Sequence, residues 1–224
     1  MADLREIVLD TETTGLDYRQ GDRIIEIGCI ELINKIKTDN FFHTYINPQR
    51  RVNNAAFNVH GISNEFLKDK PLFSDVAKDF AAFIKDSTLV IHNAKFDIGF
   101  INHEFSLVGM PKISISGVVD TLLIARKKYP GASANLDALC KKFNISLDKR
   151  DKHGALIDSE LLAMVYVELV SGTQAKFNFQ NQNVSRKNRQ NLNFPNRSFI
   201  SSETEKAAHQ ELIKNIKTPL WGRY

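Results

Sequence analysis

The chain has 224 residues, 42% of them hydrophobic, which suits one packed domain of ordinary size plus an appendage. No run approaches the roughly eighteen consecutive apolar residues of a membrane span, and Ile7–Leu9 is too short for the apolar part of a signal peptide. The two cysteines, Cys29 and Cys140, lie in apolar stretches. We expect them to be reduced and buried, as in a cytoplasmic protein, rather than joined in a disulfide.

The positive charge of the chain is concentrated near its C-terminus. The whole chain carries a formal net charge of +4, but residues 171–224 contain nine Lys/Arg and three Asp/Glu, a net of +6. Residues 1–170 therefore carry a net charge of −2. The overall basicity says little about what the N-terminal region binds.

Strand and helix patterns alternate through the first 170 residues. Short apolar runs predict strands, and apolar residues at helical spacing predict helices. In chain order we expect strands over 6–10, 23–32 and 41–46, a helix over 73–84, a strand over 89–91, and helices over 96–108, from about 119, over 135–143 and over 155–170. This order predicts an α/β sheet flanked by helices.

The composition changes after Gly172. Residues 178–197 are dominated by Asn, Gln, Ser and Arg, with almost nothing to bury, which predicts a disordered polar linker. A helical pattern returns over 203–217, and Leu220 and Trp221 follow it.

The first acidic motif is Asp10-Thr-Glu12-Thr-Thr-Gly15, at the end of the first predicted strand. Side chains at positions i and i+2 of a strand project from one face, so Asp10 and Glu12 point together. Two carboxylates about 4 Å apart repel by about 4 kcal/mol at an effective dielectric of about 20. This repulsion favours a bound cation, although an exposed turn in which the acids never meet is the simpler interpretation of this motif alone.

Two further acidic motifs lie at predicted helix starts. The segment from His92 to Asp97 follows the strand 89–91 and places Asp97 at the start of a helix. The segment His153-Gly-Ala-Leu-Ile-Asp158 opens the last predicted helix, with His153 in the preceding loop. Taken singly, Asp97 is also explained as an acid favoured by the helix dipole, and the second segment as a capping region with an exposed His.

Together the motifs supply a complete set of groups for metal-assisted hydrolysis. Four carboxylates carry four negative charges, which two divalent cations balance, and oxygen ligands suit Mg²⁺ or Mn²⁺ rather than zinc. Two such ions, about 3.5–4 Å apart, stabilise the attacking and leaving oxygens in phosphoryl transfer. A His side chain, whose unperturbed pKa is about 6.5, can deprotonate the attacking water near neutral pH.

The same three motifs resemble those of the DEDDh family of 3′→5′ exonucleases. The position of His153 before Asp158 separates this branch from the one that uses Tyr. The resemblance covers residues 5 to about 172, and it extends to the epsilon (proofreading) subunits of bacterial DNA polymerase III. Four further stretches carry that closer likeness: Arg23–Gly28, Val59–Ile62, Asp97–Phe100 and Leu136–Leu139.

The resemblance implies a ribonuclease H-like fold with a five-stranded mixed sheet. It assigns metal binding to Asp10, Glu12, Asp97 and Asp158, and general-base catalysis to His153. It also implies that His60 contacts the terminal nucleotide. The turn from Thr13 to Leu16 would hold the sugar and base of that nucleotide, and Asp10, Glu12 and Asp158 would also face the substrate.

One position departs from the family pattern. Where the epsilon subunits carry Glu five residues before the nucleotide-contacting His, this chain has Ala55. Either Asn53 or Asn54 replaces that Glu, or the contact is absent. We expect weakened nucleotide binding rather than lost chemistry.

The C-terminal region suggests protein partners. Gln174, Phe177 and Phe179 resemble the anchors of a sliding-clamp-binding peptide, although a chance segment of a Gln- and Phe-containing tail is the alternative. The final segment is too short to fold alone. Its apolar residues suit an interface with the polymerase catalytic (alpha) subunit, and a functionless terminus is the alternative. These interface candidates are Leu212, Ile216, Leu220 and Trp221. A small theta-type subunit is a further candidate partner.

These patterns divide the chain into four parts: an exonuclease domain over 1–172, a clamp-binding peptide over 173–180, a disordered polar linker over 181–202 and a polymerase-docking segment over 203–224. A flexible linker of about 22 residues spans about 25 Å, which would keep the nuclease at high local concentration near the primer end.

We therefore predict a proofreading 3′→5′ exonuclease of the replicative DNA polymerase. It would remove mispaired nucleotides from single-stranded or frayed primer ends by two-metal-ion hydrolysis, in the cytoplasm at the nucleoid-associated replisome. One alternative is a free-standing DEDDh RNase acting on short RNA, which needs neither a clamp peptide nor a docking helix. Another is a non-catalytic scaffold that stabilises a polymerase, which would require loss of a metal ligand that this chain retains.

Overall fold

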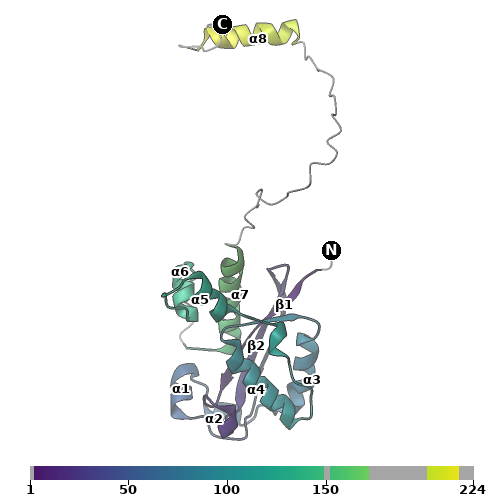
Figure 1. The fold of residues 1–224 in the computed structure, drawn as a ribbon, viewed down its shortest axis with the longest axis vertical. Helices are drawn as coiled ribbons and strands as arrows, with labels where there is room; N and C mark the ends of the chain where they lie inside the picture. The colour runs from purple at the N-terminus through teal and green to yellow at the C-terminus, as the bar shows by residue number, and fades with distance from the viewer. Residues whose placement is uncertain (1–2, 149–151, 172–200, 217–224) are drawn as a thin grey trace, which may run out of the picture. The chain divides into compact units, whose positions relative to one another are not determined.

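The structure is a computed structural model that describes residues 3–148, 152–171 and 201–216 (Figure 1). The predicted clamp-binding residues Gln174, Phe177 and Phe179 lie outside the described residues, as do Leu220, Trp221 and almost all of the predicted linker. Within the described ranges, no helix is both long and apolar enough to cross a membrane.

Five strands form one mixed sheet, as predicted (Figure 1). They are β1 (Arg5–Thr13), β2 (Ile24–Ile33), β3 (Ile36–Tyr45), β4 (Thr88–Ile91) and β5 (Val118–Asp120), in the spatial order β3-β2-β1-β4-β5. The first three strands pair antiparallel, whereas β4 pairs parallel to β1 and β5 parallel to β4. The central strand β1 is therefore paired on both sides, and its Ile7, Val8 and Leu9 are fully buried.

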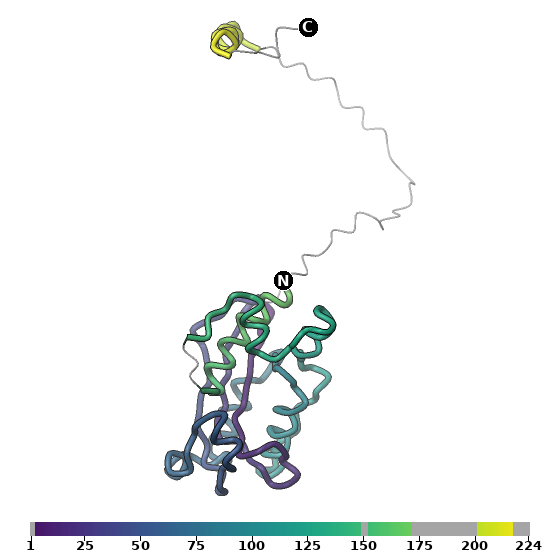
Figure 2. Tube along the Cα trace, turned by 90° about the vertical axis from the view of Figure 1, so that its left-hand side faces the viewer, coloured from purple at the N-terminus to yellow at the C-terminus, as the bar shows by residue number. Residues whose placement is uncertain are grey.

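Helices cover both faces of this sheet. In chain order they are α1 (Asn54–His60), α2 (Asn64–Leu67), α3 (Phe73–Ile84), α4 (Ala94–Leu107), α5 (Thr121–Lys128), α6 (Leu136–Lys142) and α7 (Ala155–Ser171), with short 3-10 turns η1 (Tyr18–Gln20) and η2 (Ile115–Gly117). Because side chains alternate along a strand, Ile7 and Leu9 pack with α3 and α4, and Val8 packs with α7. Figure 2 shows β1, in purple, between α7, in green, and the teal helices on the other side.

Several elements differ from the sequence predictions. The third strand, expected over 41–46, already begins at Ile36, and the short helices α1 and α2 were not predicted. The helix expected from about residue 119 begins at Thr121, because Val118 and Val119 pair with β4 as the short strand β5. Asp120 then caps α5 by accepting hydrogen bonds from the backbone N–H groups of Leu122 and Leu123. The first strand also continues three residues past Asp10, to Thr13.

The predicted state of the cysteines is confirmed. Both Cys29 and Cys140 are reduced thiols and are fully buried. Burial beside the Asp10 carboxylate raises the pKa of the Cys29 thiol well above its usual value, so this sulfur behaves as an apolar core group.

The C-terminal helix α8 (Glu203–Lys214) is described by itself. Ser202 caps its N-terminus, and the Glu205 carboxylate accepts a hydrogen bond from the Ser202 backbone in return. Leu212 is 62% exposed and Ile216 just beyond the helix is 40% exposed. The helix thus presents apolar side chains that its own fold does not cover.

Candidate active site

The four predicted acids come together from three elements. Asp10 and Glu12 lie on β1, while Asp97 and Asp158 each lie in the first turn of a helix, α4 and α7. Burial raises the pKa of Asp10 well above its usual value, and the negative charges of Asp97, Glu12 and Asp158 raise it further. The structure therefore gathers acids from distant parts of the chain into one site.

Asp97 is held in place by a neighbour of the two β1 acids. Its Oδ1 accepts hydrogen bonds from the Thr11 backbone N–H, at 3.1 Å, and from the Thr11 hydroxyl, at 2.7 Å. Asp97 is only 3% exposed, and this burial raises its pKa to about 7 even though the hydrogen bonds from Thr11 favour the charged form. Thr11 thus fixes the orientation of a carboxylate that burial alone would leave protonated.

A glycine on β2 allows α7 to bring Asp158 to the site. Gly28 is the partner of Asp10 in the β1–β2 ladder, and a Cβ at Gly28 would lie 2.3 Å from the carbonyl carbon of Ala155. The Ser159 hydroxyl also donates to the Gly28 carbonyl at 2.8 Å. The first turn of α7 is therefore pressed against β2 at the level of Asp10.

His153 lies directly before α7, with 45% of its side chain exposed. Its Nδ1 is 3.0 Å from Oδ2 of Asp158. An Nδ1–H donated to that carboxylate leaves the lone pair of Nε2 available to accept a proton. The ring is thus open to solvent and lies close enough to Asp158 to be oriented by its carboxylate.

The loop that carries His153 is attached to α1. The His153 backbone N–H donates to the Val59 carbonyl at 3.3 Å, and the Lys152 ammonium lies 5.4 Å from the centre of the Phe57 ring. Gly61, which ends α1 with a φ of +71°, lies against the Lys152 side chain, whose Cδ would be 2.5 Å from an added Cβ. The base loop and α1 are consequently packed as neighbours.

The donor set fits a divalent cation. Carboxylate oxygens of Glu12 and Asp158 lie within 4.8 Å of each other, with a ring nitrogen of His153 equally close, and the charges of the surrounding acids raise the pKa of Asp10. Hard oxygen donors are the ligands that Mg²⁺ and Mn²⁺ prefer. A cation among these groups would relieve their mutual repulsion.

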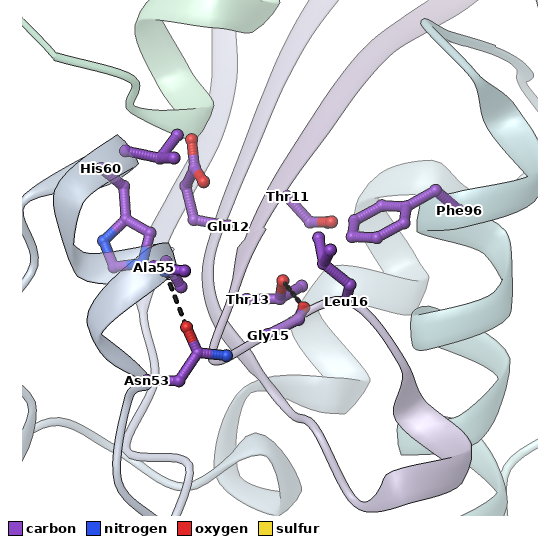
Figure 3. Close-up of a pocket in the computed structure, with 11 residues that line it drawn as sticks. Thr11, Glu12, Thr13, Gly15, Leu16, Asn53, Ala55, His60 and Phe96 are labelled. Atoms are coloured by element: carbon purple, nitrogen blue, oxygen red, sulfur yellow. Dashed lines mark hydrogen bonds between the residues drawn. The ribbon is translucent and has the colours of Figure 1, made fainter.

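A cavity of about 290 Å³ lies beside the acids. Its lining residues are Thr11, Glu12, Thr13, Gly15, Leu16, Asn53, Ala55, Ala56, Val59, His60 and Phe96. In Figure 3, Glu12 and His60 lie on one side, and Leu16 and Phe96 lie together on the other. The Thr13 hydroxyl donates to the Gly15 carbonyl at 2.6 Å and braces the turn between them.

His60 offers a buried hydrogen-bonding nitrogen in this cavity wall. Its Nδ1 accepts from the Ile62 backbone N–H at 2.9 Å, so the neutral ring carries its proton on Nε2. Burial lowers the pKa of His60, which favours that neutral form. Among the described residues, Nε2 is buried without a hydrogen bond of normal geometry, although the Thr13 backbone interacts with the ring and favours its charged form.

Of the two asparagines that could replace the contact that Ala55 lacks, Asn53 lines the cavity. Asn53 caps α1 by accepting from the Ala56 backbone N–H at 2.7 Å, so its side-chain oxygen is already engaged. Asn54 does not line the cavity, whereas Ala55 does. The wall at this point therefore combines the methyl group of Ala55 with the amide group of Asn53.

Two residues near the site were missed from the sequence. Thr11 was overlooked because nothing in the motif separates it from the other threonines. Glu26 is 2% exposed, pairs with Glu12 in the ladder, and is the fourth neighbouring acid whose negative charge raises the pKa of Asp10. Its Oε1 lies 2.7 Å from Nε2 of His43. The sequence feature that could have identified Glu26 is the presence of an acidic residue within the otherwise apolar run Ile24–Ile27.

The mixed sheet and the acids gathered at its edge define a nuclease of the ribonuclease H-like class. Residues 7–166 match the model of the exonuclease family RNase_T. Among solved structures, exonuclease X in complex with 5′ overhanging duplex DNA is similar at 25% identity with a TM-score of 0.60, over 75% of this chain and 92% of that one. The nuclease domain of 3′hExo, a DEDDh family member, shares the fold at 18% identity with a TM-score of 0.65, over 75% and 92%.

Similar proteins of known name show which branch of the exonuclease family the chain belongs to. DNA polymerase III subunit epsilon of Rickettsia felis is 50% identical over 218 residues, which is 96% of this chain and 95% of that protein. The subunit of the same name from Salmonella typhimurium is 43% identical over 228 residues, 95% and 93% of the two chains. The chain belongs to the exonuclease family and, within it, to the DNA polymerase III epsilon subunits. It is accordingly a 3′→5′ exonuclease of a divalent-metal-dependent family.

Proposed function

We propose that Asp10, Glu12, Asp97 and Asp158 hold two divalent cations, Mg²⁺ or Mn²⁺, and that this chain removes mispaired nucleotides from primer 3′ ends. The observation that carries the proposal is the convergence of these four acids beside His153. When bound, the cations supply positive charge and Lewis acidity to phosphodiester hydrolysis.

His153 acts as the general base. Nε2 removes a proton from the attacking water while Nδ1–H remains bonded to Asp158. The water oxygen forms a bond to phosphorus, the P–O3′ bond breaks, and the departing 3′ oxygen takes a proton from solvent. The carboxylate of Asp158 stabilises the imidazolium that forms, as the orienting acid does in other His-based catalysts.

The cavity beside the acids holds the terminal nucleotide. Leu16 and Phe96 provide apolar contacts for the base, and the turn from Thr13 to Leu16 contacts the sugar. His60 donates from Nε2 to an acceptor on the nucleotide, since this nitrogen is buried without a hydrogen bond of normal geometry among the described residues. The lack of an acid at Ala55 weakens nucleotide binding without affecting the chemistry.

The segments that follow the exonuclease domain attach it to the replication machinery. Gln174, Phe177 and Phe179 bind the sliding clamp, and the segment with Leu212, Ile216, Leu220 and Trp221 binds the alpha subunit. The exposure of Leu212 and Ile216 supports this assignment, because apolar anchors that the helix leaves uncovered suit an interface. A theta-type subunit is a further partner, and the complex acts at the nucleoid.

Two variants with opposite effects test the proposal. Asp10→Ala should abolish digestion of mispaired primers in Mg²⁺ yet still bind the alpha subunit and the clamp. Removal of residues 172–224 should preserve digestion of free single strands and abolish both associations. Residual nuclease activity in the first variant would contradict the metal assignment, and retained binding in the second would contradict the role of the tail.

The substrate is tested separately. The full chain should digest a mispaired primer end and single-stranded DNA in preference to short RNA, and the replicative polymerase should increase removal of the mispair. A preference for short RNA would instead identify a free-standing RNase.

A further inference from the structure

Three depressions on the exonuclease domain are neighbours that share lining residues. The cavity beside the acids shares Leu16 and Phe96 with a second depression of about 410 Å³. The second depression shares Tyr18 and Lys95 with a third of the same size, which continues between η1 and α4 to Lys112. A strand that leaves the first cavity past Leu16 and Phe96 would therefore reach the second depression.

The second and third depressions carry more positive than negative charge. Arg19, Lys95 and Lys112 are all exposed and line them. Among the lining residues the opposing acid is Asp17, whose carboxylate accepts hydrogen bonds from the Arg19 backbone and the Gln20 side chain. Residues 1–170 have a net charge of −2, so this basic surface is local. A phosphate backbone is attracted to such a cluster.

The wall between these cations contains a fixed aromatic ring. Tyr18 packs edge-on against Phe100, with 5.6 Å between ring centres, and its ring centre is also 5.6 Å from that of His103. A Cβ at Gly99 would lie 2.7 Å from the Tyr18 ring, so the ring rests directly on α4. The Arg19 guanidinium lies 5.6 Å from the same ring. Partly exposed aromatic rings among cations are typical of surfaces on which bases of a single strand stack.

We propose that this basic groove, formed by Tyr18, Arg19, Lys95 and Lys112, binds the single DNA strand on the 5′ side of the terminal nucleotide. The proposal rests on the proposed function, because it assumes that the terminal nucleotide occupies the first cavity. The shared residues Leu16 and Phe96 favour the cleaved strand over its complement, since they join the groove directly to that cavity. The cations contact successive phosphates, and Tyr18 stacks with a base.

The test compares two double variants of the full chain in Mg²⁺. Lys95→Ala/Lys112→Ala removes two cations of the groove, and Lys78→Ala/Lys85→Ala removes two exposed cations of α3 and its C-terminal end. Substrates are single-stranded DNA of about 20 nucleotides and the p-nitrophenyl ester of thymidine 5′-monophosphate, which has no upstream strand. The groove variant should lower kcat/KM on the long strand about tenfold relative to the ester, and the control should leave that ratio unchanged.

Salt dependence and charge-preserving substitutions test whether the effect comes from the positive charges of Lys95 and Lys112. The slope of log affinity against log salt for the long strand should fall by about 0.7 for each lost phosphate contact. Lys95→Arg/Lys112→Arg should retain both the ratio and the slope, because the positive charges remain.

Three results would overturn the proposal. An equal loss in the control variant would show a general effect of charge. An equal loss on the ester would place the damage in the catalytic site. A loss confined to primer–template duplexes would assign the groove to the complementary strand. By contrast, failure of the unmodified chain to hydrolyse either substrate would overturn the proposed function itself.

Discussion

Gly28 and Ala155 approach each other so closely that a Cβ on Gly28 would lie 2.3 Å from the Ala155 carbonyl carbon. Both partners of this contact are backbone, so neither can move aside as a flexible side chain would. The contact places the first turn of α7 against the strand position opposite Asp10. The position of Asp158 relative to Asp10 thus depends on residue 28 being a glycine, which has no Cβ.

Gly28→Ala should therefore lower both stability and activity. Overpacking costs about 1–3 kcal/mol when the surroundings can adjust, and here α7 must shift and carry Asp158 with it. Urea unfolding and the rate of single-strand digestion measure the two effects. Gly117→Ala is the matched control, because no atom lies within 4 Å of its added Cβ and its φ is not positive. Equal behaviour of the two variants would contradict the role of this contact.

Thr11→Val should weaken metal binding while keeping the fold. The substitution removes the hydroxyl that donates to Asp97 Oδ1 at 2.7 Å, and the loss of a partner that orients a metal ligand costs about 10–100-fold in metal affinity or activity. Titration of activity with Mg²⁺ should show half-maximal activity at a correspondingly higher concentration. Thr11→Ser keeps the hydroxyl and should behave like the unmodified chain; an equal shift in both variants would assign the effect to packing.

Without metal, stability should fall as pH rises through the acidic and neutral range. The pKa of Asp97 is about 7 in the folded protein, against an ordinary value of 3.8, so the folded state holds this proton more tightly than the unfolded state does. Between about pH 4 and 7 the unfolded chain has released the proton and the folded chain has not, and the free energy of unfolding decreases with increasing pH.

Thermal melting in a chelator checks this expectation. The Tm of Asp97→Asn should not decrease with rising pH. At pH 8 this variant should melt at a higher temperature than the unmodified chain, although it loses activity. Asp79→Asn, at an exposed position of α3, should retain the decline. Added Mg²⁺ should raise the Tm of the unmodified chain more at pH 8 than at pH 6, because cations and protons compete for the same oxygens. A metal-free Tm that rises with pH and depends on Asp97 would contradict the shift.

Glu104→Gln should be strongly destabilising. Glu104 is 1% exposed and accepts two hydrogen bonds of 2.7 Å from the Arg23 guanidinium, joining α4 to β2. Loss of one partner of a buried ion pair costs about 3–5 kcal/mol. The comparison is Glu160→Gln, whose partner Lys37 is 51% exposed and whose loss should cost at most about 1 kcal/mol. Urea unfolding distinguishes the two, and similar costs would contradict the importance of burial.

The sequence predicted structure best where apolar residues recur at the period of a helix or strand that packs against the core. The helix predicted over 73–84 has those bounds in the structure, because Phe73, Ala77 and Phe80 must face the core. The period of two along β1 placed Asp10 and Glu12 together even though the strand extended further than predicted. Such periodicities are local, and they can be read without knowledge of the neighbours.

The relationships that shape the site are not local. The strand β5 has only three residues and becomes a strand through its pairing with β4, so its pattern was attributed to the following helix. The hydrogen bonds from Thr11 to Asp97 join residues 86 positions apart. The capping role of Asn53, beside Ala55 in the cavity wall, depends on α1, a helix of seven residues without a distinct apolar period. These features follow from tertiary packing.

The position of α1 has a consequence for substrate selection. One side of this helix forms the wall of the nucleotide cavity, and its carbonyl at Val59 holds the backbone of His153. A nucleotide that is too large for the cavity would push this wall outward and draw the proton acceptor away from the attacking water. A terminal nucleotide that fits the cavity poorly is therefore expected to lower kcat more than it lowers substrate affinity. The enzyme would then select chain ends by shape in the cleavage step as well as in binding.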